Sequence, residues 1–305
     1  MNISIFFNEE FIMNMKKFCF FIFKILLLVF TLSVLIDYIY STCYLQTRQR
    51  GKIGFIFNSE PQKFDVIILG SSRANNHLVS KMFTDKGLRT FNFGMQGSKL
   101  FESDLVLKLL LERKCIIKNV IIDVDVTLKS ERKSEANCLK FLPYFHRSQV
   151  IKKHFEGLKD YNAFCYIPFY RYLKYDTKIG FREAFFCSIN KKSHELDYGG
   201  YNALPSLNQK LKVENLNFNP KPNRYYEEIK EICKINRINL IAIMTPVCDN
   251  VKGIDYFKKV NKLYPEIHNY ENVVIEDKYF SSCGHMNDNG AKMFTAKILK
   301  DFFKK

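Results

Sequence analysis

The chain of 305 residues is long enough for one large domain or two small ones, and a hydrophobic fraction of 47% provides for a sizeable core. The net charge of +16 is spread along the sequence rather than clustered, and no nucleic-acid-binding motif accompanies it. A nucleic-acid partner is therefore disfavoured, whereas anionic lipid surfaces or acidic polymers suit this charge.

Nine cysteines form no Cys-x-x-Cys pair and have no histidines at paired spacing. This pattern favours neither a zinc site nor a redox motif, and we expect no metal and no cofactor. An odd number of cysteines in a chain of this length does not imply a disulfide framework. We expect most of them to be small buried hydrophobic residues.

Residues 1–17 are predicted to be a short N-terminal tail and residues 18–40 a transmembrane anchor. Between positions 18 and 36 the only charged residue is Lys24, and about 20 apolar residues are enough to cross the hydrocarbon core of a bilayer. A cleaved signal peptide is the alternative, but the apolar run is long for one and no small-residue cleavage site follows. An uncleaved single-pass anchor is favoured.

The numbers of Lys and Arg on the two sides of this segment are equal, so the count alone does not decide its orientation in the membrane. Three lysines, at 16, 17 and 24, lie on its N-terminal side, and two arginines and a lysine, at 48, 50 and 52, follow it. The short N-terminus and the lysine pair next to the apolar run favour a cytoplasmic N-terminus. The C-terminal domain is then expected outside the cytoplasm, on the periplasmic or extracellular face.

After a polar connector (41–63), residues 64–127 are predicted to be the first half of an α/β domain. A continuous apolar run at 66–69 stops in Gly-Ser-Ser and indicates a buried parallel strand that enters a helix. A short strand at 90–94, a helix over 100–111 with Ser98 as a possible cap, and a strand at 120–126 follow. Strands and helices that alternate at this spacing predict a parallel sheet.

Residues 128–222 lose this alternation and are predicted to be an aromatic, basic insertion that caps the carboxyl edge of the sheet. The segment has 17 Lys and Arg against 9 Asp and Glu, and 14 Phe and Tyr lie between positions 141 and 186. Such side chains suit stacking on sugars or contact with a membrane surface. The alternative is that the phenylalanines form the insertion's own small core.

Residues 223–305 are predicted to be the second half of the α/β domain. Helices are expected over 225–236 and 254–263, and strands at 240–244 and 273–275. A terminal helix over 290–303 has Asn287 or Asp288 as its cap. The prediction is a five-stranded sheet interrupted by one insertion.

Two loops carry residues suited to chemistry. Ser71 and Ser72 stand where a predicted strand enters a helix, and ligands of open α/β sheets bind at such carboxyl ends. There a serine either caps the helix or acts as a nucleophile. His285 lies in a Gly- and Ser-rich loop just before the terminal helix. If that loop reaches the same edge, His285 is a candidate general base for the serine.

Three blocks of this sequence resemble the SGNH (GDSL-like) hydrolase superfamily, in particular its membrane-anchored branches linked to cell-envelope polysaccharides. Gly70-Ser71-Ser72 matches the Gly-Asp-Ser block, which makes Ser72 the implied nucleophile. The Gly-Ser-Ser form is similar to that of envelope O-acylation and D-alanyl-transfer proteins. The block Asn-x-x-x-x-Gly is matched from Asn92 to Gly97. By this resemblance the Gly97 and Ser72 N–H groups form an oxyanion hole.

The last family block, Asp-x-x-His before a helix, is matched at His285, the implied base. Two departures accompany it. Ser282 stands in place of the aspartate, so Asp277, Asp288 or a backbone carbonyl is left to orient the imidazole. The family's Gly-x-Asn-Asp block is missing, because residues 124–127 read Val-Asp-Val-Thr. The resemblance covers roughly 65–126 and 239–304.

The resemblance implies a three-layer α/β/α sandwich with a five-stranded parallel sheet, the flavodoxin-like SGNH fold. It also implies a membrane-anchored serine esterase or O-acyltransferase that acts on acyl esters of cell-envelope or exopolysaccharide, with a membrane acyltransferase as a possible partner. The second interpretation, favoured by the two departures, is a catalytically degenerate relative that binds polysaccharide or aids its assembly at the membrane.

Overall fold

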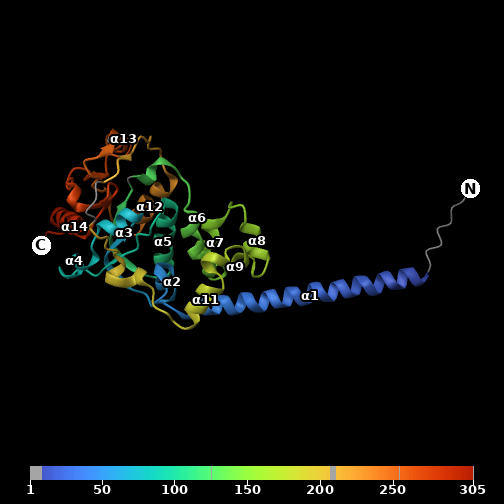
Figure 1. Cartoon of the computed structure of the whole chain (residues 1–305). Helices are drawn as coiled ribbons and strands as arrows, with labels where there is room; N and C mark the ends of the chain where they lie inside the picture. The colour runs from blue at the N-terminus through green and yellow to red at the C-terminus, as the bar shows by residue number, and fades with distance from the viewer. Residues whose placement is uncertain (1–8, 125, 207–210, 254, 305) are drawn as a thin grey trace, which may run out of the picture.

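A computed structural model describes residues 9–124, 126–206, 211–253 and 255–304 (Figure 1). A long helix, α1 (Glu9–Gln46), extends away from an α/β body. The body contains a sheet of five parallel strands in the order β2-β1-β3-β5-β7. These strands are β1 (Lys63–Leu69), β2 (Thr90–Asn92), β3 (Ile116–Asp123), β5 (Asn239–Met244) and β7 (His268–Asn269). The predicted α/β class with a parallel five-stranded sheet is confirmed.

Continuous apolar runs explain why both faces of the sheet are buried. In β1, Val66 and Ile68 enter one hydrophobic cluster, and Ile67 and Leu69 enter another, because successive side chains of a strand point to opposite faces. Helices α3 (Ser72–His77), α4 (Ser80–Thr84) and α14 (Asp288–Phe302) contribute to the first cluster. Helices α2 (Gly51–Asn58), α5 (Leu100–Glu112), α12 (Arg224–Ile235) and α13 (Asp255–Leu263) contribute to the second.

The edge strand of the sheet differs from the prediction. Residues 273–275 lie in a loop, where Val274 packs into the cluster beneath α14. The edge position belongs to β7, whose His268 and Asn269 pair with Ile243 and Met244. Both β7 residues are polar and exposed. Because such a strand needs only backbone hydrogen bonds, hydrophobic patterning does not reveal it.

Two short pairings lie outside the main sheet. Strands β4 (Glu214–Asn215) and β6 (Val251–Lys252) are parallel, and β8 (Phe280–Ser282) and β9 (His285–Met286) form an antiparallel hairpin. A 3-10 turn, η4 (Asp277–Tyr279), precedes this hairpin. The terminal helix α14 follows it, capped as predicted by Asn287, whose Oδ1 accepts the Gly290 N–H at 3.1 Å.

Two predictions for the first half of the chain were wrong. The segment 41–63 is not a polar connector, because it contains the end of α1 and the whole of α2, whose Ile53, Ile56 and Phe57 are buried. Helix α5 begins after Lys99, and the buried hydroxyl of Ser98 has no hydrogen-bond partner among the described residues. The N-terminal end of α5 is stabilised instead by Glu102, which accepts the Lys99 N–H at 2.8 Å.

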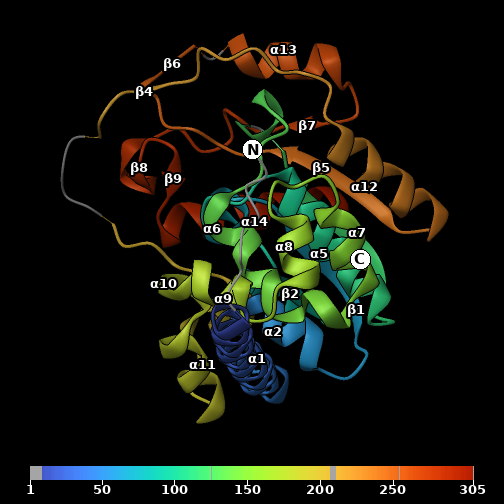
Figure 2. The same cartoon turned by 90° about the vertical axis from the view of Figure 1, so that its right-hand side faces the viewer.

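The segment 128–222 contains short helices that pack beside α1, α2 and α5 rather than over the carboxyl edge of the sheet. Figure 2 shows α8, α9, α10 and α11 gathered around α1. The helices are α6 (Glu135–Cys138), α7 (Gln149–Phe155), α8 (Tyr161–Tyr166), α9 (Tyr170–Lys174), α10 (Asp176–Ile179) and α11 (Phe181–Ser188), with 3-10 turns η1 (Val126–Lys129), η2 (Leu139–Arg147) and η3 (His194–Gly200).

Burial of aromatic side chains explains this placement. Phe141, Phe145, Phe155 and Phe164 belong to the same hydrophobic cluster as α2, α5 and α12. The alternative that these phenylalanines form a core therefore holds, although that core is continuous with the body. The expectation that residues 128–222 cap the carboxyl edge was wrong for their aromatic helices, because the apolar surfaces of α1, α2 and α5 bury these helices elsewhere. It holds for the end of the segment, where Leu216 lines the same pocket as Ser72.

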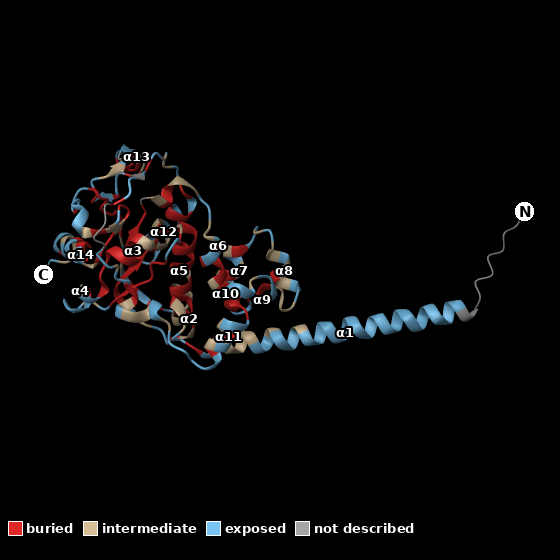
Figure 3. Ribbon diagram, viewed as in Figure 1, coloured by how far each residue is buried: buried red, intermediate tan, exposed pale blue. Residues whose placement is uncertain are grey.

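Helix α1 changes character along its length (Figure 3). Most of its side chains are exposed as far as Ile39, and from Tyr40 the helix packs into the body. Tyr44 is buried in the hydrophobic cluster, and its hydroxyl donates to the Ile179 carbonyl at 2.9 Å. The stretch Phe11–Gln46 is long and apolar enough to cross a membrane.

Candidate active site

The turn between β1 and α3 places Ser71 and Ser72 at the carboxyl edge of the sheet. Gly70 has φ of +135°, a backbone conformation that favours glycine. A Cβ atom on Gly70 would lie 2.9 Å from the Cβ of Ala74 and 3.0 Å from that of Asp123. The turn therefore requires glycine at position 70, and Ser72 becomes the first residue of α3.

The two serines make different contacts. Ser71 Oγ accepts the Arg73 N–H at 3.2 Å, which caps α3, and donates to Asp123 Oδ2 at 2.8 Å. Ser72 Oγ instead lies 2.8 Å from Nε2 of His285. Capping thus belongs to Ser71, and Ser72 is the serine that lies beside a potential general base.

His285 begins β9, and the β8–β9 hairpin brings it over the turn. Its Nδ1 lies 3.2 Å from the hydroxyl of Ser282. The two acids considered for orienting the ring make contacts elsewhere. Asp277 accepts a hydrogen bond from Asn250 at 3.0 Å, and Asp288 accepts one from the Tyr201 hydroxyl at 3.0 Å. A hydroxyl can orient an imidazole, but it brings no negative charge to stabilise an imidazolium.

Arg73 fixes the backbone of the histidine loop, a role that the sequence analysis missed. Its side chain is buried, and its guanidinium donates to the Gly284 carbonyl at 3.1 Å and to the Pro246 carbonyl at 3.1 Å. These bonds join the loop after β5 to the residue that precedes His285. The adjacency of an arginine to the Gly-Ser-Ser block was the available sequence signal.

A disulfide between Cys248 and Cys283 joins the same two loops. The Cys248 N–H also donates to the Cys283 carbonyl at 3.2 Å. This bond is not predictable from the sequence, because 35 positions separate the two cysteines and only the fold brings their Cα atoms to 4.9 Å. The expectation that most of the nine cysteines are small buried hydrophobic residues holds for four of them, Cys115, Cys138, Cys187 and Cys233, which are buried and free.

His77, at the end of α3, supports the hairpin from below. Its Nε2 accepts the Met286 N–H at 3.0 Å, and its ring lies edge-on to that of His285 with centroids 6.1 Å apart. Complete burial, reinforced by the charges of Arg73 and His285, lowers the pKa of His77 well below its usual value. The residue is therefore neutral, with its Nε2 lone pair free to accept. Its position on a short helix left no pattern that the sequence analysis could use.

The two residues of the second sequence block have separate roles. Gly97 lines the same pocket as Ser72 and has φ of +71°, although a Cβ atom there would meet nothing within 4 Å. Asn92 is buried, donates to the carbonyls of Ala74 and Leu78, and accepts the Gly94 N–H. Asn92 therefore stabilises α3 and the turn after β2, so it supports the site from outside the pocket.

The pocket at Ser72 and His285 has a volume of about 110 Å³, well below the roughly 300–1,000 Å³ of sites for drug-sized ligands. One part of its wall is polar, and the other is formed by small or branched apolar side chains. Its lining residues are Ser71, Ser72, Arg73, Gly97, Ser98, Lys99, Val126, Thr127, Leu216, Val247, Val251, Gly284 and His285. A pocket of this size suits a short acyl group.

The wall that follows β3 stands where the family's third block is missing. Val126 and Thr127 line the pocket there, and Asp125 lies outside the described residues. The Thr127 hydroxyl donates to the Val124 carbonyl at 2.8 Å, which occupies its proton. At the carboxyl end of β3, Asp123 is fully buried beside Ser71.

A buried lysine, Lys52 of α2, joins the segments behind the turn. Its ammonium group donates to Asn75 Oδ1 at 2.7 Å, to the Gly94 carbonyl at 2.5 Å and to the Gly200 carbonyl at 2.7 Å. Burial lowers the pKa of Lys52 to about 7. Three acceptors nevertheless call for three N–H bonds, which only the ammonium form has. Lys52 thus joins α2 to α3, to the turn after β2 and to the end of η3.

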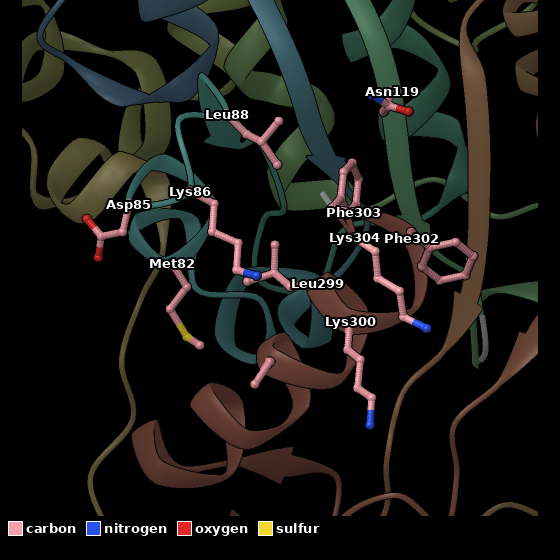
Figure 4. A pocket seen from close by; sticks show the side chains of 11 residues that line it. Met82, Asp85, Lys86, Leu88, Asn119, Leu299, Lys300, Phe302, Phe303 and Lys304 are labelled. Carbon is pink, nitrogen blue, oxygen red and sulfur yellow. The ribbon is translucent and has the colours of Figure 1, made fainter.

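A larger cavity of about 940 Å³ lies near the start of β3, away from Ser72 (Figure 4). Its wall includes apolar side chains of α14 and the residues that follow it, among them Leu299, Phe302 and Phe303. Lys86 and Lys300 also line the cavity. No serine, cysteine or histidine is among its lining residues. Volume alone therefore does not identify the reactive site of this molecule.

Among the described residues, no group of three or more His, Cys, Asp or Glu side chains is arranged to hold a metal ion. A search of protein-family models gives no match to the chain, and a search of curated proteins gives none either. The support for the chemistry of the site is therefore its own geometry. A serine hydroxyl 2.8 Å from an imidazole nitrogen is the arrangement of an activated nucleophile.

Proposed function

We propose that this protein is a membrane-anchored, extracytoplasmic serine esterase or O-acyltransferase of SGNH type, which acts on acyl esters of cell-envelope or exopolysaccharide. The observation that carries the proposal is the 2.8 Å contact between Ser72 Oγ and His285 Nε2. The turn geometry at Gly70 and the parallel sheet are consistent with the three-layer α/β/α sandwich that the SGNH resemblance implies.

In the proposed reaction His285 removes the proton of Ser72 as Oγ attacks the ester carbonyl carbon. The oxyanion that forms is stabilised by the backbone N–H groups of Ser72 and Gly97. Collapse of this intermediate breaks the ester C–O bond, and the imidazolium returns its proton to the leaving oxygen. Water or a sugar hydroxyl then attacks the acyl-serine by the same steps, which yields hydrolysis or transfer.

The pocket volume of about 110 Å³ supports a short acyl group, because a long chain has no room beside Val126, Leu216 and Val247. Lys99 at the pocket suits a polar or anionic acceptor such as a polysaccharide. A membrane acyltransferase that supplies the acyl group fits a transferase role.

Two features support an uncleaved anchor and an outside location. Helix α1 continues without a break from the apolar run to Tyr40 and Tyr44, which pack against the body, so no extended segment for cleavage separates the two. The Cys248–Cys283 disulfide suits an oxidising compartment, which the cytoplasm is not. Protease added to cells from which any outer membrane has been removed is expected to cut exposed Lys and Arg sites of the body. Protection of those sites would overturn the proposed orientation.

The Ser282 hydroxyl at His285 Nδ1 favours a second candidate function. Without a carboxylate in this place, the scaffold could serve as a catalytically degenerate protein that binds polysaccharide or aids its assembly. In this case Ser72 and His285 would no longer act as nucleophile and base, and other residues would bind the polysaccharide.

An active-site serine probe separates the two candidates. A fluorophosphonate is expected to label the wild-type chain, to leave Ser72→Ala unlabelled, and to label His285→Ala much more slowly. Ser188→Ala, which removes an exposed serine of α11, is the control and should label like the wild type. Absence of labelling in folded wild-type protein, with polysaccharide binding retained by the Ser72 and His285 variants, would establish the degenerate alternative.

A further inference from the structure

The level at which α1 would leave a bilayer can be read from the chain, and this inference rests on its proposed role as an anchor. Positions 18–36 span about 28 Å at 1.5 Å per residue, close to the ~30 Å thickness of a hydrocarbon core. Asp37 is the first charged residue after Lys24. Asp37 therefore marks the boundary between the acyl chains and the lipid headgroups.

The loop between α8 and α9 is attached to α1 at that level. Asp37 accepts the Phe169 N–H at 2.8 Å and a bond from the Arg171 guanidinium at 2.9 Å. The Arg171 side chain is buried in this contact. One turn further, the Tyr40 ring packs edge-to-face against Phe169 with centroids 5.0 Å apart. Hydrogen bonds and ring packing thus hold the loop at the height of the bilayer surface.

Apolar side chains around this loop are exposed. Tyr166 is 80%, Ile167 53% and Leu173 70% exposed, and we call these three residues the loop patch. Since large apolar side chains are mostly buried, a group of them at the level of Asp37 calls for a partner. Figure 2, which looks along α1 toward the body, shows α9 next to α1 and α8 beyond α9.

The surroundings of the loop patch match a lipid partner in charge and in shape. Between positions 146 and 192 the chain has ten Lys and Arg against four Asp and Glu, which favours anionic headgroups. A cavity of about 340 Å³ separates α1 from the loop, and its wall includes Val34, Tyr38, Arg147 and Ile167. Apolar residues beside an arginine suit the part of a lipid where acyl chain meets headgroup.

We propose that the loop patch inserts into the headgroup region of an anionic bilayer, as a second membrane contact beside α1. One helix alone leaves the body free to tilt and rotate about the anchor. A second contact some distance from the helix axis removes that freedom. It holds the pocket at Ser72 at a set height and orientation above the membrane, where an acyl donor or a membrane-attached glycan is presented.

The absence of tryptophan makes a direct test possible. Full-length Tyr166→Trp is reconstituted into nanodiscs with brominated acyl chains, composed either of phosphatidylcholine alone or with phosphatidylglycerol. Tyr198→Trp is the matched control, because Tyr198 is 74% exposed on η3, which packs against α2, α4 and β2 of the body. A second reporter, Leu173→Trp, guards against a local effect of one substitution.

Both patch reporters are expected to emit at shorter wavelength and to be quenched several-fold more strongly than the Tyr198→Trp control, most strongly with phosphatidylglycerol. Patch reporters quenched no more than the control, in protein retained by the nanodisc after an alkaline wash, would overturn the docking proposal alone. Equal quenching in both lipid compositions would overturn its anionic preference. Loss of the protein from the nanodisc on washing would instead overturn the anchor.

Discussion

At the scale of single residues, the candidate site is a serine and a histidine whose Nδ1 lies beside the neutral hydroxyl of Ser282. Ser72, His285 and Ser282 are linked by contacts of 2.8 and 3.2 Å. In a Ser-His-Asp site the carboxylate stabilises the imidazolium that forms as the serine attacks. Ser282 can orient the ring but brings no negative charge to Nδ1, so a carboxylate at position 282 is expected to add to the stabilisation of the imidazolium.

Ser282→Asp should therefore increase the rate. A carboxylate in place of the hydroxyl that lies 3.2 Å from Nδ1 would stabilise the imidazolium. We expect kcat for a chromogenic acetyl ester to rise on the order of 10-fold, with solvent exposure limiting the gain. Ser282→Asn, which keeps a hydrogen-bonding group without the charge, is the control. An aspartate variant no faster than the asparagine variant would show that charge at this position is not what limits the rate.

His77 makes the stability of the hairpin depend on pH. Its folded pKa lies well below the ordinary value of about 6.5, so below that pH the unfolded chain binds a proton that the folded chain does not. The contribution of neutral His77 to the free energy of unfolding is therefore fully present above about pH 6.5 and decreases as the pH falls below it. His77→Gln keeps an acceptor for the Met286 N–H but has no group that titrates in this range. Between about pH 6.5 and 5, its free energy of unfolding should therefore decrease by up to ~1.4 kcal/mol less per pH unit than that of the wild type. Urea unfolding of both proteins over this pH range measures the difference. If their free energies of unfolding change in parallel with pH, His77 is not a neutral buried group.

At the scale of elements, the β8–β9 hairpin depends on attachments outside itself. Its strands have only three and two residues, and isolated hairpins are marginally stable at best. Arg73, His77 and the Cys248–Cys283 disulfide hold it in place. The position of His285 is therefore set by α3 and by the loop after β5.

Removal of the disulfide should loosen this hairpin. We expect Cys248→Ala combined with Cys283→Ala to lower the free energy of unfolding by roughly 2–4 kcal/mol, because the bond closes a loop of 35 positions. Labelling of Ser72 by the serine probe should slow as His285 becomes mobile. A reductant should lower the urea midpoint of the wild type and of the control Cys233→Ala, and leave the double variant unchanged. A wild-type midpoint insensitive to reductant would refute this role.

At the scale of the whole molecule, α1 is both a long apolar helix and part of the body. Its C-terminal end packs against α11 and η2, with Tyr44 buried. The Asp37–Arg171 ion pair lies where the exposed length ends. An element that only targeted the chain would not need these contacts.

Truncation at two points tests this. Residues 35–305 should fold in detergent, whereas residues 47–305 lack Asp37, Tyr40 and Tyr44. Because loss of one large buried aromatic costs about 3–5 kcal/mol, the shorter chain should unfold at a much lower temperature, or fail to fold. Thermal unfolding followed by circular dichroism compares them. Equal unfolding temperatures would show that the end of α1 is dispensable.

The sequence by itself determined the parallel α/β class, the long apolar helix and the cap of α14. These features depend on local patterns, since apolar runs, Gly-Ser turns and capping residues act over a few positions. Contacts between distant parts of the chain could not be predicted from the sequence. The bonds of the Arg73 guanidinium, the bond to His77 Nε2 and the Cys248–Cys283 disulfide join segments that only the fold brings together. Strand β7 was also not predictable from the sequence, because pairing at the edge of a sheet uses backbone groups that every residue has.

The Gly-Ser-Ser turn shows the same division. Its sequence determined a strand that ends at Gly70 and a serine at the start of a helix, because only glycine fits that backbone and serine readily caps. Which serine caps was decided by the tertiary structure, since Asp123 from β3 holds Ser71. The hairpin then brings His285 to Ser72 from 213 positions away. Local chemistry set the residue types, and long-range packing set their partners.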